Sequence, residues 1–202
     1  NLVLTGSGYI NGTGNSLANS LVGNDGSNSL VGGAGDDIVT LGGAVTGQTY
    51  DLGVGSGDKL ILSSAGANTV TVNNIETIAG SGSVNDTVTF TAAVSGISVD
   101  LGGGTDRVIL ADAANTLSLN ATVETVTGGT LADNITLTAA ATGTVYNLGA
   151  GTDRLTLASG TNTITASDVE SIVGGSGTDD VTLTTVTTNL LVDLGGGTTD
   201  KL

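Results

Sequence analysis

Short runs in which apolar and polar residues alternate recur along the whole chain. Examples are Asp37-Ile-Val-Thr-Leu41, Lys59-Leu-Ile-Leu62, Asn68-Thr-Val-Thr-Val72 and Arg107-Val-Ile-Leu110. A period of two is typical of a β-strand that buries one face. The pattern therefore predicts inward side chains at Val39, Leu41, Leu60, Leu62, Val70, Val72, Val108 and Leu110. The Thr, Ser, Lys and Arg residues between them are predicted to point outward.

These runs belong to a longer repeat that is plain in the sequence. The first copy opens with Asp51-Leu-Gly-Val-Gly-Ser-Gly-Asp58. Later copies open with Asp100-Leu-Gly-Gly-Gly-Thr-Asp106, Asn147-Leu-Gly-Ala-Gly-Thr-Asp153 and Asp193-Leu-Gly-Gly-Gly-Thr-Thr-Asp200, at spacings of 49, 47 and 46 residues. Tandem repetition at such a period indicates an array of stacked structural units.

Short strands joined by turns rich in Gly, Asn and Asp, with no helical stretch, predict a chain that coils and stacks on itself. Consecutive coils then pair in parallel at about 4.8 Å per layer. The predicted fold is an all-β, right-handed parallel β-solenoid, because parallel crossovers are almost always right-handed.

The N-terminal part repeats with a shorter period. Gly14-Asn-Ser-Leu-Ala-Asn19, Gly23-Asn-Asp-Gly-Ser-Asn28 and Gly32-Gly-Ala-Gly-Asp-Asp37 follow one another at nine residues. We therefore expect nonapeptide coils over residues 1–43 and about three and a half repeats of about 47 residues over 44–202. Because no linker separates the two regions, one contiguous solenoid is predicted.

The charge of the chain narrows the classes of function. Nineteen acids against four bases give a net charge of −15, and there is no His and no Cys. Nucleic acid is not expected as a partner, since phosphate binding requires clusters of Lys and Arg. There is no His to act as a general base or zinc ligand and no Cys to act as a nucleophile, so an enzyme is not expected. No apolar stretch is long enough to predict insertion into a membrane.

One nonapeptide carries a recognisable metal-binding pattern. Gly32-Gly33-Ala34-Gly35-Asp36-Asp37-Ile38-Val39-Thr40 fits G-G-x-G-x-D-x-U-x, in which U is a large apolar residue. The glycines allow turns with positive φ that direct carbonyl oxygens to a common point, and the Asp adds a charged oxygen. Calcium accepts such mixed shells of carbonyl and carboxylate oxygens.

On these residues the sequence resembles the haemolysin-type, or RTX, calcium-binding proteins, strongly over residues 14–43 and more loosely over 44–202. The resemblance implies a parallel β-roll, type I secretion from a bacterium, and folding on meeting extracellular calcium. The sequence departs from the family pattern where Asn19 and Asn28 replace Asp. The segments 53–58 and 195–200 also carry one extra residue.

The predicted ligand set combines oxygen-bearing side chains with the glycines of the turns. Asp37 is expected to bind calcium with Asn19, one coil earlier, as its partner. The full set is Asn19, Gly23, Asn28, Gly32, Gly33, Gly35, Asp37, Asp58, Asp106, Asp153, Asp179 and Asp200. For the Asp residues outside the nonapeptides, a turn in which Asp caps its own backbone is the competing interpretation. Glu76, Glu124 and Glu170 are interpreted as a ladder or a solvated face.

The leading hypothesis for function is a calcium-stabilised structural or adhesive module of a large secreted bacterial surface protein, surface layer or extracellular filament. Expected partners are calcium ions, tandem or self-associated copies of the repeat, and cell-surface polysaccharide. Two alternatives stay open. One is an accessory solenoid of a secreted polysaccharide-active enzyme; the other is a face of Thr rows that binds ice or glycan. Lys59, Arg107, Arg154 and Lys201 each follow the repeat Asp and are expected to form one periodic row. The segment is expected to be cut from a longer repetitive protein.

Overall fold

The computed structural model describes residues 1–185 and 187–202, which divide into two compact units. Unit 1 comprises residues 1–91 and 97–106, and unit 2 comprises residues 92–96 and 107–202. The described residues form strands and turns without any helix, as the alternating pattern predicted. None of them therefore lies in a helix long and apolar enough to cross a membrane.

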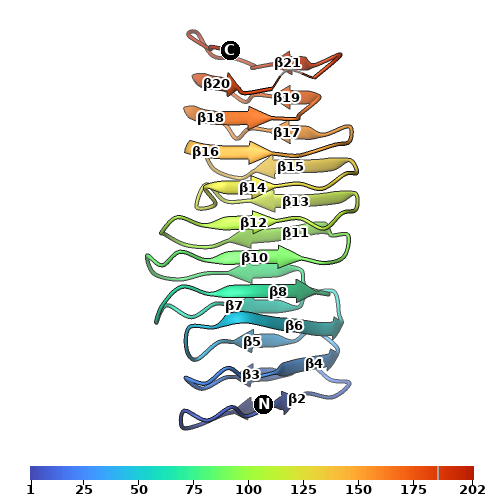
Figure 1. Cartoon of the computed structure of the whole chain (residues 1–202), viewed down its shortest axis with the longest axis vertical. Coiled ribbons are helices and arrows are strands. Elements are labelled where there is room, and N and C mark those ends of the chain that lie inside the picture. Colours follow the sequence, from blue (N-terminus) through green and yellow to red (C-terminus); the bar gives the residue numbers. More distant parts are fainter. Residues whose placement is uncertain (186) are drawn as a thin grey trace. The chain divides into compact units, whose positions relative to one another are not determined.

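Unit 1 is built from parallel strands that pair two places apart along the chain (Figure 1). One sheet has the order β1-β3-β5-β7-β9-β11 and the other β2-β4-β6-β8-β10. The strands are β1 (Leu2–Val3), β2 (Gly12–Thr13), β3 (Ser20–Val22), β4 (Leu30–Ala34), β5 (Ile38–Thr40), β6 (Thr46–Val54), β7 (Lys59–Ile61), β8 (Thr69–Asn73), β9 (Thr77–Ala79), β10 (Thr87–Phe90) and β11 (Ser95–Asp100), of which Ser98–Asp100 pair with β9.

Unit 2 has the same construction. Its sheets have the orders β13-β15-β17-β19-β21 and β12-β14-β16-β18-β20. The strands are β12 (Arg107–Ile109), β13 (Asn115–Leu119), β14 (Thr125–Thr127), β15 (Asp133–Leu137), β16 (Thr142–Asn147), β17 (Arg154–Thr156), β18 (Asn162–Ser167), β19 (Ser171–Val173), β20 (Asp179–Leu183) and β21 (Leu191–Asp193). Each unit is thus a parallel β-solenoid, which confirms the predicted fold class.

One coil contains one strand of each sheet. In unit 1, Leu21 pairs with Val39, 18 residues later, and Val39 pairs with Leu60, a further 21 residues along. Two nonapeptides therefore make one coil, as the placing of Asn19 one coil before Asp37 required. The strands of unit 1 also pair across the boundary between residues 43 and 44, since β4 pairs with β6 and β5 with β7.

The 47-residue repeat contains five strands, which is two and a half coils. Its opening motif lies in β6 at Asp51 and in β11 at Asp100, and these strands belong to different sheets of unit 1. Because five is odd, each new copy begins on the opposite sheet. The predicted single row of basic residues is therefore wrong: in unit 2, Arg107 lies on β12 in one sheet and Arg154 on β17 in the other.

The core of each unit is formed by the inward side chains of the two sheets. All eight residues predicted to point inward are buried, from Val39, Leu60, Val72 and Val108 at 0 % exposure to Leu41 and Leu110 at 5 %. Tyr50 and Tyr146, at equivalent positions of two repeats, are also fully buried. Burial raises the pKa of both phenols to about 12. Thr, Ser, Lys and Arg take many of the outward positions, as predicted, but Val31, Ile38 and Val145 also point outward, at 39 %, 41 % and 42 % exposure.

Candidate cation-binding carboxylate ladders

In unit 1, one position at the edge of a sheet is polar in four successive coils. It lies one residue before β3, β5, β7 and β9, whose first residues are in register. The four residues are Asn19, Asp37, Asp58 and Glu76, which we call the first ladder. In the next coil the equivalent residue is Ile97, which is buried, so the ladder ends at Glu76.

Backbone N–H groups connect the rungs of the first ladder. The N–H of Asn19 donates to Asp37 Oδ1 at 2.7 Å, and that of Asp37 donates to Asp58 Oδ1 at 2.6 Å. The N–H of Asp58 donates to Glu76 Oε2 at 2.8 Å. Bonds of this kind to ionised acceptors are strong, and here each one joins two coils.

Each Asp of the first ladder has only one of its two oxygens satisfied. Asp37 and Asp58 are both 0 % exposed, and the Oδ2 of each has no hydrogen-bond partner among the described residues. In the described part of the chain, neither carboxylate forms an ion pair with Lys or Arg. A buried charge is expensive unless it is paired, bound to a metal or neutralised. The first ladder therefore lacks a compensating positive charge.

Unit 2 contains a second ladder of the same composition. Asn115, Asp133, Asp153 and Glu170 occupy the equivalent positions at β13, β15, β17 and β19. The N–H of Asp133 donates to Asp153 Oδ1 at 2.7 Å, and that of Asp153 donates to Glu170 Oε2 at 2.7 Å. Asp153 is 1 % exposed, and its Oδ2 also has no partner among the described residues.

Partial ladders lie at the edge of the other sheet in each unit. In unit 1, Asn68 and Asp86 precede β8 and β10, and the N–H of Asp86 donates to Asp106 Oδ1 at 2.7 Å. In unit 2, the amide of Asn162 donates to Asp179 Oδ1 at 2.6 Å, and the N–H of Asp179 donates to Asp200 Oδ1 at 3.0 Å. This change of sheet follows directly from the odd number of strands in the repeat.

Glycine is required beneath several of these carboxylates. A Cβ on Gly32 would lie 2.4 Å from Asp37 Oδ2 and 2.3 Å from the carbonyl oxygen of Leu52. The same arrangement recurs at Gly128 with Asp133 and Leu148, and at Gly174 with Asp179 and Leu194. A carboxylate oxygen and a carbonyl oxygen from the next coil therefore converge above a glycine. The two halves of the repeat, the Gly-Gly turn and the Asp-Leu-Gly motif, meet at this point.

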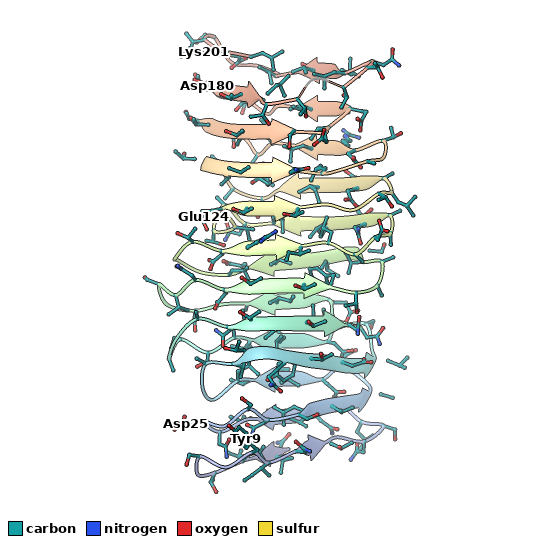
Figure 2. The ribbon with its side chains drawn as sticks, in the orientation of Figure 1. Tyr9, Asp25, Glu124, Asp180 and Lys201 are labelled. Atoms are coloured by element: carbon teal, nitrogen blue, oxygen red, sulfur yellow. The ribbon has the colours of Figure 1, made fainter. Side chains whose placement is uncertain are left out.

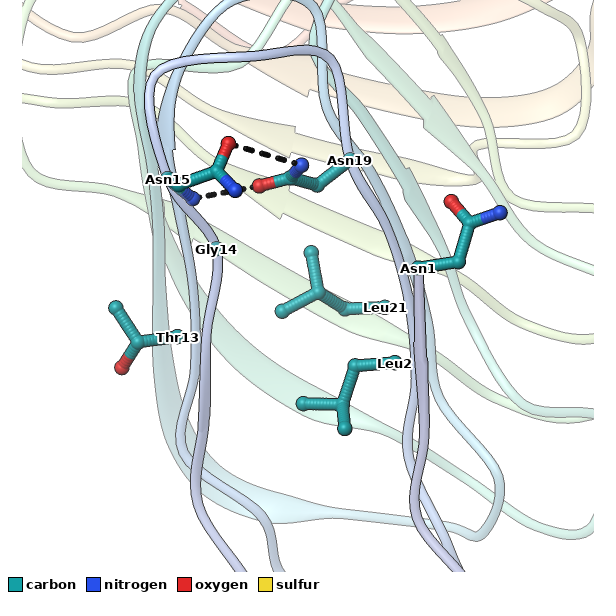
Figure 3. Close-up of a pocket in the computed structure, with 7 residues that line it drawn as sticks. All are labelled: Asn1, Leu2, Thr13, Gly14, Asn15, Asn19 and Leu21. Atoms are coloured by element: carbon teal, nitrogen blue, oxygen red, sulfur yellow. Dashed lines mark hydrogen bonds between the residues drawn. The ribbon is translucent and has the colours of Figure 1, made fainter.

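The two N-terminal nonapeptide turns have a different polar structure. Asn15 N–H donates to Asn19 Oδ1 at 2.6 Å, and the Asn19 amide donates to Asn15 Oδ1 at 3.4 Å (Figure 3). In the next turn, Asn24 N–H donates to Asn28 Oδ1 at 2.8 Å, and the Asn28 amide donates to Asn24 Oδ1 at 2.9 Å. These turns are held together by neutral amides. A cavity of about 210 Å³ lies beside the first turn, lined by Asn1, Leu2, Thr13, Gly14, Asn15, Asn19 and Leu21.

The electrostatics of the ladders disfavour ionised carboxylates. Burial is the main cause that raises the pKa of Asp153 to about 6, and Asp133, Glu170 and Asp168 add repulsion. Burial likewise raises the pKa of Asp58, to which Glu76, Asp37 and Asp36 contribute repulsion. The pKa values of Asp86 and Asp133 are also raised by burial. A positive charge placed among these carboxylates would therefore favour their ionised form and stabilise the fold.

The residues predicted as calcium ligands fall into four groups. Asp37, Asp58, Asp106, Asp153 and Asp200 all accept a backbone N–H from the preceding coil, and Asp179 accepts the side-chain amide of Asn162. Gly33 and Gly35 have the predicted positive φ, at 122° and 94°. Gly23 and Gly32 lie beside the Asn28 and Asp37 oxygens instead, without positive φ. Asn28 bonds within its own turn, and Asn19 bonds both there and, through its N–H, to Asp37.

Sequence reasoning missed several members of the ladders. Asp86 and Asp133 were not among the predicted ligands, although each precedes an alternating run as Asp37 does. Glu76 and Glu170 are interpreted from the sequence as a ladder or a solvated face, and the hydrogen bonds from the N–H groups of Asp58 and Asp153 favour the ladder. Among the described residues, no three acidic side chains come together closely enough to hold a metal ion.

No protein-family model, curated protein or solved structure matches this chain.

Proposed function

We propose that this chain is a calcium-stabilised structural or adhesive module of a large secreted bacterial surface protein or extracellular filament. The observation that carries the proposal is the use of its polar side chains to join one coil to the next. Asp37, Asp58, Asp133 and Asp153 all serve this purpose from buried positions. Hydrogen bonds of this kind stabilise the stacking of one coil on the next, which supports a structural role for the repeat.

The donor set of the ladders fits calcium. Buried carboxylate oxygens without partners stand beside carbonyl oxygens of the Gly-rich turns, and calcium prefers oxygen ligands of both kinds. Asp37, Asp58, Asp153 and Asp179 would contribute the charged oxygens. When bound, the ion supplies the positive charge that the ladders lack, so that binding free energy becomes folding free energy.

The first test is the dependence of stability on calcium. We expect circular dichroism to show a higher melting temperature in millimolar calcium than in a chelator, with magnesium giving a smaller effect. Limited proteolysis should show the same order of resistance. Identical melting in calcium and in excess chelator would contradict the calcium element of the proposal.

The second test concerns the role of the module. We expect the coding sequence on either side to contain further copies of the same repeat. A catalytic domain next to the module would instead favour an accessory solenoid of a secreted enzyme. This result would reject the spacer role without bearing on calcium.

One observation favours a second candidate function, the binding of ice or glycan. Thr49, Thr71 and Thr89 are in register on β6, β8 and β10 and point outward, and Thr69 and Thr87 form a neighbouring row. Parallel strands therefore space these hydroxyls regularly over one face of unit 1.

The matched test of this second function uses bulky substitutions. Thr71→Tyr disrupts the Thr rows, whereas Thr116→Tyr alters an exposed Thr of unit 2 whose neighbour is Asn134. If the rows bind ice or a polysaccharide, only Thr71→Tyr should lower thermal hysteresis or retention on the immobilised glycan. Equal behaviour of the two variants, or no binding by the wild type, would reject this candidate.

A further inference from the structure

We infer that each complete ladder binds a hard divalent cation at its carboxylate-to-carboxylate steps, with the terminal Glu as a ligand. In the first ladder these steps are Asp37–Asp58 and Asp58–Glu76, and in the second they are Asp133–Asp153 and Asp153–Glu170. This inference rests on the calcium element of the proposed function. It adds the location of the ion and assigns Glu76 and Glu170 to it.

The steps of a ladder differ in how completely they are satisfied. At the Asn115–Asp133 step, both the backbone N–H and the side-chain amide of Asn115 donate to Asp133 Oδ1, at 3.2 and 2.7 Å. At the Asp133–Asp153 step only one backbone N–H bridges two carboxylates. In the second ladder the amide therefore closes its step with neutral donors, whereas the carboxylate step leaves negative charge facing negative charge. In the first ladder the Asn19 amide donates to Asn15 instead, and Asp37 Oδ2 has no partner among the described residues.

The buried free oxygen of Asp58 marks the carboxylate steps in unit 1. Asp58 is 0 % exposed, and its Oδ2 has no hydrogen-bond partner among the described residues. The position that a Cβ on Gly55 would take lies 2.6 Å from this oxygen and 2.6 Å from the carbonyl oxygen of Gly35. A charged oxygen and a turn carbonyl thus both lie beside Gly55.

Unit 2 contains a related arrangement, in which the oxygen beside the glycine is the one that already accepts a hydrogen bond. A Cβ on Gly151 would lie 2.7 Å from Asp153 Oδ1, which accepts the N–H of Asp133, and 2.9 Å from the carbonyl oxygen of Leu131. Asp153 Oδ2 is buried without a partner among the described residues. Because three acidic side chains do not converge anywhere in the described chain, the shell has to include carbonyl oxygens. Calcium tolerates such irregular shells, whereas magnesium demands near-octahedral geometry.

The terminal Glu completes the negative charge of the ladder without being buried itself. Glu76 and Glu170 are half-buried, and each accepts the N–H of the preceding Asp through Oε2. Because the Glu side chain is longer than that of Asp, its carboxylate reaches the backbone N–H of the Asp in the preceding coil. A Gln at this position can still accept that N–H through its amide oxygen, but it cannot contribute charge to an ion.

The experiment is calcium titration by calorimetry on the double variant Glu76→Gln/Glu170→Gln. We expect at least a tenfold loss of affinity, or the loss of ions from the stoichiometry. The melting temperature in chelator should be unchanged or higher, because like-charge repulsion is relieved. The matched control is Asp51→Asn/Asp112→Asn, which removes the same charge from exposed residues outside the ladders and should bind calcium as the wild type does.

Each result has a defined meaning. Equal calcium binding by the wild type and the Gln variant would overturn this inference while leaving a calcium-stabilised module intact. Equal losses in the Gln variant and the Asn control would also overturn it, since they would indicate a general charge effect. No calcium binding by the wild type would instead defeat the calcium element of the proposed function. If the double variant does not fold in chelator, Glu76→Gln and Glu170→Gln are titrated singly.

Discussion

The nonapeptide turns and the 47-residue repeats build the same coil edge from different chemistry. Asn24 and Asn28 satisfy each other within one turn, through two hydrogen bonds between neutral groups. Asp133 and Asp153 stand one coil apart, joined by a single backbone N–H, and leave a buried carboxylate oxygen without a partner. An amide brings its own donors, whereas a carboxylate only accepts. The nonapeptide turns are therefore self-sufficient, and the carboxylate ladders depend on something added.

The buried carboxylates do not lie mainly where the sequence matches the calcium-binding motif best. The strongest match to a calcium-binding motif lies over residues 14–43, where two of the three nonapeptides have Asn in place of Asp. The looser matches over residues 44–202 contain most of the buried carboxylates. Asp37 belongs to both, as the end of the last nonapeptide and as the second rung of the first ladder.

The largest effect is expected where a ladder leaves no room for a side chain. Gly32→Ala would place its Cβ 2.3 Å from the backbone oxygen of Leu52 and 2.4 Å from Asp37 Oδ2. Because the backbone of the next coil cannot move away easily, we expect a loss of about 3 kcal/mol in the free energy of unfolding. Chemical denaturation measures this loss. Gly8→Ala is the control, since its nearest atom is Ile10 Cγ1 at 4.0 Å, and comparable losses in both variants would contradict the explanation.

A charge introduced into the nonapeptide turn should disrupt the hydrogen bonds by which Asn24 and Asn28 satisfy each other. Asn28→Asp replaces the amide donor to Asn24 Oδ1 by an acceptor at a site that is 3 % exposed. We expect a destabilisation of about 2 kcal/mol in metal-free buffer, because two acceptors then face each other. Asn15→Asp, at an exposed residue that can still accept from Leu17 N–H, should change little. Denaturation curves that coincide for Asn28→Asp and the wild type would refute the comparison.

The opposite substitution should make a ladder resemble the nonapeptide turn. Asp58→Asn removes one of three charges from the first ladder and still offers an oxygen to Asp37 N–H. In chelator we expect a higher melting temperature by a few degrees, and the further rise caused by calcium should shrink. A lower melting temperature in chelator would show that the charge of Asp58 stabilises the fold by itself.

The pH dependence of the metal-free protein sharpens the same contrast. Burial raises the pKa of Asp153 to about 6, above its ordinary value of 3.8. A raised folded-state pKa stabilises the protein below the unfolded-state pKa, and this stability is lost as the pH rises through about 6. In chelator, melting temperatures should therefore increase from pH 7 to pH 5. Asp153→Asn should reduce this increase and the exposed Asp112→Asn should not; a slope that is the same in all three proteins would contradict the assignment.

The smallest effect is expected for a charge that is exposed and paired. Lys201 Nζ lies 3.5 Å from Asp180 Oδ2, and the two side chains are 71 % and 40 % exposed (Figure 2). Exposed pairs contribute little, so Lys201→Ala should change the free energy of unfolding by less than about 0.5 kcal/mol. A loss above about 1 kcal/mol would show that exposed charges matter here as much as buried ones.

Much of this fold could be predicted from the sequence because successive coils repeat the same local pattern of apolar, polar and turn residues. The alternation at Leu60 and Leu62 or Val70 and Val72 identifies the buried face, and the absence of helical patterns identifies an all-β chain. Twice the nine-residue period over 14–40 equals the 18 residues that separate Leu21 from its partner Val39. These are local properties, and the register of neighbouring coils repeats them.

Only the tertiary structure decided which residues stand above one another. The 47-residue period suggests one row of Lys59, Arg107, Arg154 and Lys201, but five strands per repeat send successive copies to opposite sheets. The Asn–Asp–Asp–Glu order of a ladder is invisible in a linear reading, because its members are separated by whole coils. Burial and the lack of a counter-charge at Asp58 and Asp153 depend on those neighbours, which the sequence alone does not place.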